Sequence, residues 1–76
     1  MEIDLSQARR TVAELSEMLE ALDGTEVDDA PTRAARRQHA RITRELLYLS
    51  HLGARASTEI MGTYHDFKFR HDPVGE

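Results

Sequence analysis

The chain has 76 residues, a formal net charge of -4 and no cysteine; 39% of its residues are hydrophobic and 32% are charged. A domain of this size hides only about 60% of the surface that its unfolded chain exposes, and disulfide bonds and thiolate zinc sites are excluded as supports. Four glycines and two prolines are too few for a turn-rich all-β domain. No apolar run approaches the roughly 20 residues of a membrane span and no signal peptide is evident, so we expect a cytoplasmic protein without membrane contact.

The first periodic segment covers residues 5–22 and predicts a helix over about residues 5–23. Its apolar residues are separated alternately by three and four positions, which is the heptad spacing of one helix face. Asp4 suits the N-cap position, and Gly24 suits the left-handed residue that often follows a helix. The apolar residues of this segment are Leu5, Ala8, Val12, Leu15, Leu19 and Leu22.

Residues 24–31 predict a loop, after which a longer helix extends over about residues 32–63. Asp28 or Asp29 can cap the start of this helix. Two lines of apolar residues run along it, so we expect it to be buried on more than one side. Gly53 leaves two alternatives open, a continuous helix or a bent one. The first line, with spacings of three and four, is Thr32, Ala35, His39, Ile42, Leu46, Leu49, Gly53, Ala56, Ile60 and Thr63; the second, with a spacing of seven, is Ala40, Leu47, Ala54 and Met61.

The predicted fold class is all-α: an antiparallel two-helix hairpin domain over residues 1–63, which pairs with a second copy to form a four-helix bundle. A hairpin this small has little core of its own, and a two-fold dimer is the commonest way to cover a second apolar face. Acidic residues dominate residues 1–30, and arginines dominate residues 31–55. Folding the helices back about the middle of the loop therefore predicts three charge pairs, which are Glu20–Arg36, Glu17–Arg37 and Glu14–Arg41.

Residues 64–76 read as an aromatic and polar C-terminal tail. In the register above, the first helix ends near Gly53 of the second, so the rest of the chain overhangs. The three aromatic residues of the tail either fold back to cap the bundle or anchor another protein; they are Tyr64, Phe67 and Phe69. The loose alternation of the tail is compatible with an extended conformation, which would place on one face His65, Phe67, Phe69 and His71.

The sequence favours a non-enzymatic protein–protein interaction module, such as an adaptor, an inhibitor, an assembly factor or a structural subunit. It has no nucleophile motif and no glycine-rich phosphate loop, so we expect no enzymatic activity, no small-molecule substrate and no cofactor. The histidines lack the i, i+4 spacing of helical metal ligands, so no metal site is expected. The partner is expected to be a second copy, another protein or both. The predicted interface residues are Leu46, Leu47, Leu49, Leu52, Ala54, Ile60, Met61, Tyr64, Phe67 and Phe69.

The alternative is a small dimeric nucleic-acid-binding regulator. Four arginines form a stripe along one side of the second helix, and arginine suits bidentate binding of phosphate. A negative net charge and the absence of aromatic residues interleaved for base stacking favour the protein-interaction hypothesis over this alternative. The arginines of this stripe are Arg33, Arg37, Arg41 and Arg44.

Overall fold

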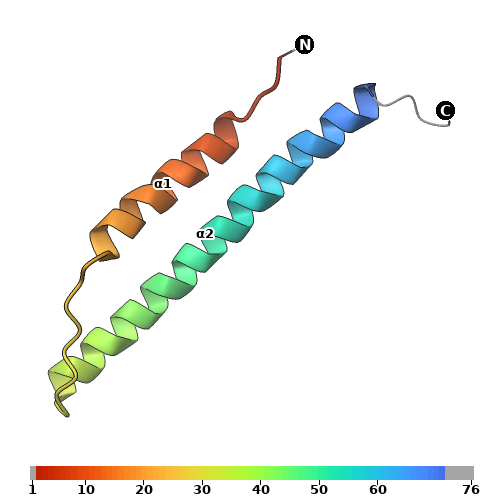
Figure 1. The fold of residues 1–76 in the computed structure, drawn as a ribbon. Coiled ribbons are helices and arrows are strands. Elements are labelled where there is room, and N and C mark those ends of the chain that lie inside the picture. The colour runs from red at the N-terminus through yellow and green to blue at the C-terminus, as the bar shows by residue number, and fades with distance from the viewer. Residues whose placement is uncertain (1, 72–76) are drawn as a thin grey trace.

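A computed structural model describes residues 2–71 of the chain, and these residues form two helices and no strand. Helix α1 covers Ser6–Leu22 and helix α2 covers Arg33–His71 (Figure 1). The all-helical class that the three-and-four spacing predicts is therefore confirmed. Residues 72–76 of the predicted tail lie outside the described residues.

Helix α1 begins and ends close to the predicted positions. The Asp4 carboxylate accepts hydrogen bonds from the hydroxyl of Ser6 at 2.6 Å and from its backbone N–H at 3.0 Å, and these bonds lower the pKa of Asp4. Leu5 takes the cap position itself, one residue later than expected. At the other end Gly24 has a φ of 77°, the left-handed conformation that glycine adopts without a steric penalty.

Helix α2 begins with a different cap from the predicted one. The Thr32 hydroxyl accepts a hydrogen bond from the backbone N–H of Ala35 at 3.1 Å, which satisfies one of the free donors of the first turn. Asp28 instead accepts a bond from the N–H of Ala30 and stabilises the loop. The prediction that Asp28 or Asp29 caps this helix is wrong, because the loop continues to residue 32.

Helix α2 passes through Gly53 without a break and continues to His71, eight residues beyond the expected end near residue 63. The prediction of an extended conformation for residues 64–71 is wrong. Local contacts one turn apart favour the helix there: Asp66 and Arg70 form an ion pair at 3.8 Å, and the rings of Phe67 and His71 stack with centroids 4.4 Å apart. The basic residues of the last turn also suit the negative end of the helix dipole.

Helix α1 lies alongside α2 and runs in the opposite direction (Figure 1). The loop does not turn back at its middle but follows the first turns of α2. Gln38 holds it in this path, because its side chain accepts a bond from the N–H of Asp28 and donates one to the carbonyl of Glu26. The ring Nε2 of His39 donates to the carbonyl of Asp28 at 2.6 Å.

This extended loop shifts the register of the helices. The start of α1 is level with Thr63, whose hydroxyl donates to the carbonyl of Asp4 at 3.4 Å. The prediction that α1 reaches along α2 only as far as Gly53 is therefore wrong. The three predicted charge pairs do not form. They were derived by folding the helices back about the middle of the loop, and each acid of α1 lies beside a later part of α2 than that folding gives. Within residues 2–71 the ion pairs lie inside α2, and they are Arg41–Glu45, Arg55–Glu59 and Arg70–Asp66.

The core is a single narrow seam between the two helices. Its largest fully buried side chains are Leu52, which is 2% exposed, and Thr11, which is 1% exposed. The molecule measures 64 × 21 × 14 Å, so it is about one helix thick. The remaining buried residues are Ala8, Leu49 and Ala56 of the seam and Ala35 in the first turns of α2, which the loop follows.

Candidate interaction surface

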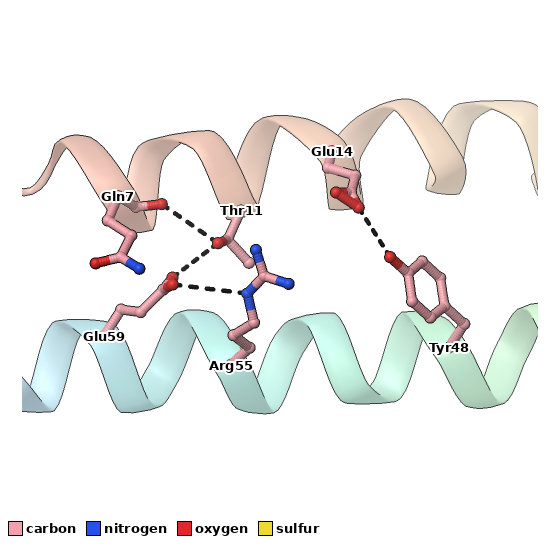
Figure 2. Close-up of polar contacts among 6 residues, drawn as sticks. All are labelled: Gln7, Thr11, Glu14, Tyr48, Arg55 and Glu59. Atoms are coloured by element: carbon pink, nitrogen blue, oxygen red, sulfur yellow. Dashed lines mark hydrogen bonds and ion pairs between the residues drawn. The ribbon is translucent and has the colours of Figure 1, made fainter.

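A polar cluster fixes the pairing of α1 with α2 on one side of the seam. The buried hydroxyl of Thr11 donates to Glu59 Oε1 at 2.7 Å and lies 3.2 Å from the carbonyl of Gln7 (Figure 2). Glu59 Oε2 in turn lies 3.6 Å from the guanidinium of Arg55. Since the carboxylate of Glu59 is mostly buried, these partners satisfy a group that would be costly to leave unpaired.

A second polar contact lies farther along the same side. The hydroxyl of Tyr48 donates to Glu14 Oε2 at 3.0 Å (Figure 2). This hydrogen bond and the negative charge of Glu14 raise the pKa of Tyr48, because both favour the neutral phenol. Glu14 was expected to pair with Arg41, so the sequence analysis missed this contact and the one between Thr11 and Glu59. In the sequence, the only indication of these two contacts was the presence of polar residues beside the apolar residues of the helices.

Only some residues of the predicted apolar line of α2 are buried in the seam between the helices. Leu49 and Ala56, which are seven residues apart, turn towards α1 and are buried, and Ala35 is buried in the first turns of α2, which the loop follows. Leu46 and Ile60 belong to the same predicted line but are 54% and 47% exposed. Leu52 and Glu59 take the places beside the buried residues instead. The second helix therefore turns one flank of its line towards α1 and leaves the other flank open.

The open flank forms a surface that we call the apolar face. Leu19 of α1 and Leu46 of α2 line the same shallow groove, so both helices contribute to this side of the molecule. Residues seven positions from these two lie on the same face of each helix. Tyr48 and Glu14, which contact each other, lie on the opposite, polar side. The apolar face consists of Leu5, which caps α1, Val12 and Leu19 of α1, and Leu46, Leu47, Gly53, Ala54, Ile60 and Met61 of α2.

The predicted interface residues divide into two sets. Leu49 and Leu52 are buried against α1 and are not on the surface of this molecule. The others are exposed, and five of them lie on the apolar face. These five are Leu46, Leu47, Ala54, Ile60 and Met61.

The aromatic residues do not fold back over the helices but continue along α2 beyond its contact with Asp4. Phe67 lies seven residues after Ile60, on the side of the apolar face, and Tyr64 borders that side. Phe69 turns to the polar side, where it lines a groove with Ile3, and it is 79% exposed. Because the segment is helical, Phe67 and Phe69 point in different directions and do not form the single docking strip that an extended tail would give.

The arginines of the predicted stripe remain on the surface of the first half of α2. Arg37, Arg41 and Arg44 line one shallow groove with Ala34 and Ala40. Arg41 is paired with Glu45 of its own helix at 4.0 Å. The acidic residues of α1 were expected to neutralise this stripe, and no ion pair joins them to it within residues 2–71.

The described residues contain no group of three or more His, Asp or Glu side chains placed to hold a metal ion. Neither helix, as described, is both long and apolar enough to cross a membrane. The grooves that the described residues line are open to solvent. No protein-family model matches the chain, and no curated protein or solved structure matches it significantly.

Proposed function

We propose that the protein is a small non-enzymatic protein–protein interaction module that acts through its apolar face and the aromatic turns at the end of α2. The observation that carries this proposal is the exposure of large apolar side chains on one face. Leu47 is 58% exposed, and Leu19, Leu46, Ile60 and Met61 are about half exposed. A contiguous apolar surface of this kind is typical of a binding site.

The shape of the molecule supports the same conclusion. Its radius of gyration is 18.9 Å, whereas a compact domain of this length has a radius of about 11 Å. A layer one helix thick buries its side chains on one seam only. The apolar face is the surface that a partner would cover to complete a core.

The simplest such partner is a second copy, which would turn two helix pairs into a four-helix bundle. Two amphipathic layers of this kind bury both apolar faces at once, and a two-fold dimer is the commonest soluble assembly. An adaptor, an inhibitor, an assembly factor or a structural subunit could each be built on this bundle, with the aromatic turns left to bind a further protein.

The substitution Leu47→Glu tests this proposal. It places a charge on the apolar face without touching the seam, so it should convert a dimer into a monomer in multi-angle light scattering at micromolar concentration. Gly62→Glu is the matched control, because Gly62 is exposed on the polar side of α2, where it lines a groove with Glu59, and an added Cβ there meets no atom within 4 Å. A dimer that tolerates the Leu47 variant, or an unmutated chain that is monomeric at high micromolar concentration, would contradict the proposed self-association.

A second candidate function, a dimeric nucleic-acid-binding regulator, is favoured by one observation. The groove lined by Arg37, Arg41 and Arg44 is not neutralised by α1. Phosphate-led binding of duplex DNA should be measurable at 50 mM salt and should weaken steeply at 200 mM. Arg37→Ala and Arg44→Ala should reduce it, while Leu47→Glu should not reduce it beyond its effect on dimerisation. An absence of binding at 50 mM salt eliminates this candidate.

A further inference from the structure

No contact within a single molecule explains why a glycine, Gly53, stands in the middle of α2. An added Cβ would meet no atom within 4 Å, and the residue has an ordinary helical φ. Glycine lowers helix propensity more than any residue except proline, so this position is costly to the isolated helix. It lies on the apolar face, where a missing side chain lets another helix approach closely.

The sequence of small and large residues before Gly53 is repeated in reverse order after Ala54. Two serines come first, at residues 50 and 57, and two pairs of large apolar residues follow, at residues 46–47 and 60–61. In an antiparallel pair of α2 helices with a two-fold axis at Gly53 and Ala54, Ser50 faces Ser57 of the other copy. The large side chains then meet large side chains, and the small ones meet at the axis. A two-fold interface requires this self-complementarity.

Helix α1 also has a symmetric arrangement of apolar residues, and its centre lies beside Gly53 and Ala54 of α2. The exposed apolar residues Leu5, at the cap of α1, Val12 and Leu19 are seven apart and therefore symmetric about Val12. The contacts Thr11–Glu59 and Glu14–Tyr48 fix the level of α1 on α2. Midway between the two contacts lie residues 12–13 on α1 and residues 53–54 on α2. One axis perpendicular to the helices can therefore relate both α1 helices and both α2 helices.

The apolar face also has the composition and the size that a second copy needs. From Thr43 to Phe67, no charged residue occurs on this side of α2, although Arg44, Glu45, Arg55 and Glu59 lie on its other sides. Depletion of charge is characteristic of interface cores. The broad side of the molecule measures 64 by 21 Å, which exceeds the roughly 800 Å² that each partner gives to a standard interface.

We propose that a second copy of this chain covers the apolar face in an antiparallel arrangement, with α2 crossing its symmetry mate at Gly53 and Ala54 and α1 crossing its mate at Val12. This inference rests on the proposed self-association and adds its geometry. The four helices form a two-layer bundle in which the polar sides, with Thr11–Glu59 and Tyr48–Glu14, face outward. The loop end of each copy lies over the terminal end of the other.

The absence of cysteine makes this geometry testable by disulfide formation between introduced cysteines. Ser50→Cys and Ser57→Cys are both substitutions of exposed serines on the interface side of α2. When the two variants are co-refolded and oxidised, a covalent dimer that contains one chain of each should form. Either variant alone should remain uncrosslinked, because identical positions lie about 10 Å apart along the helix axis. Gly62→Cys, on the polar side, is the control that should not crosslink.

Light scattering on the same samples separates the possible failures. A monomer contradicts the self-association and this geometry together. A dimer in which Ser50→Cys crosslinks with itself, or in which no crosslink joins residues 50 and 57, overturns the antiparallel geometry and leaves the self-association standing.

A pair of glycine substitutions provides a second measurement. Gly53 and Gly62 are both in α2, and neither has an atom within 4 Å of an added Cβ. Gly53→Leu should raise the dissociation constant of the dimer at least tenfold, because the side chain fills the crossing point. Gly62→Leu should leave that constant within twofold. Equal effects of the two substitutions overturn the assignment of the crossing point to Gly53.

Discussion

At the scale of single residues, the structure depends on two polar side chains that cross the seam. Thr11 is the only polar side chain that is fully buried among residues 2–71, and its hydroxyl is directed at Glu59. Shifting α1 by one residue would separate them and leave a mostly buried carboxylate without this donor. The pair thus selects one register out of several that the apolar spacing alone would allow.

Thr11→Ala removes this donor and should lower the free energy of unfolding by about 1–3 kcal/mol, the usual cost of leaving a buried polar group unpaired. Urea unfolding at a fixed protomer concentration measures the change. Thr58→Ala is the control, since Thr58 is an exposed threonine of α2, and should change stability by less than about 0.5 kcal/mol. Equal losses in the two variants would show that Thr11 does not hold the register.

Tyr48 gives the protein a dependence on alkaline pH. Its pKa is raised above the ordinary value of 10.0 by the hydrogen bond to Glu14 and by that residue's charge. A raised pKa means that the contribution of this contact is complete below pH 10 and is lost as the pH rises through the pKa of the folded state. The stability difference between the unmutated chain and Tyr48→Phe should therefore shrink between pH 9 and 11.

The control for this pH series is Tyr64→Phe, which removes a hydroxyl that has no hydrogen-bond partner among the described residues. Its stability difference from the unmutated chain should stay flat over the same range if the effect belongs to the contact with Glu14. A parallel decrease in both variants would mean that general alkaline unfolding is being measured.

At the scale of the elements, α2 has three parts with different neighbours. The loop follows its first turns, α1 packs along its middle as far as Thr63, and the turns up to His71 extend beyond α1. The side chains of the last part should therefore contribute little to the stability of the molecule, whereas those of the middle part hold it together.

Phe69→Ala should change the free energy of unfolding by less than about 0.5 kcal/mol, because the side chain is 79% exposed. Leu52→Ala should lower it by about 2–5 kcal/mol, because the side chain is buried in the seam. Thermal unfolding followed by far-UV circular dichroism compares the two at equal concentration. A large loss in the Phe69 variant would instead indicate that the aromatic turns stabilise the folded state.

At the scale of the whole molecule, the dominant property is that many apolar side chains are exposed while few are buried in the core. A layer 14 Å thick cannot hide both flanks of α2, and ordering a small chain costs about as much free energy as its own burial provides. Most of the stability of the protein should therefore come from association. This makes the melting temperature a property of concentration as well as of sequence.

The melting temperature should fall by about 5–10 °C on hundredfold dilution, as mass action requires for a dimer that unfolds to monomers. Differential scanning fluorimetry over a dilution series measures it, and Leu47→Glu provides the comparison, since a monomer melts at the same temperature at every concentration. A melting temperature of the unmutated chain that does not change with dilution would show that the single layer is stable alone.

The sequence by itself determined that two helices form and approximately where they begin. Spacings of three and four residues mark the helix faces, and Gly24 ends α1 because it is free to take a positive φ. The sequence also marked Leu47, Ala54 and Met61 as a second apolar line, and these residues are on the surface. Local periodicity is sufficient for such conclusions, since each depends only on neighbours within a few turns.

Only the tertiary structure decided the register and which flank of α2 faces α1. The register depends on the path of the loop, and Gln38 and His39 hold the loop extended along α2. A rule based on residue numbers cannot anticipate that path, so the expected charge pairs were wrong. Leu46 and Leu52 are equally apolar, and the choice between them follows from side chains far apart in sequence. Contacts such as Thr11–Glu59 gain free energy only after the helices have met.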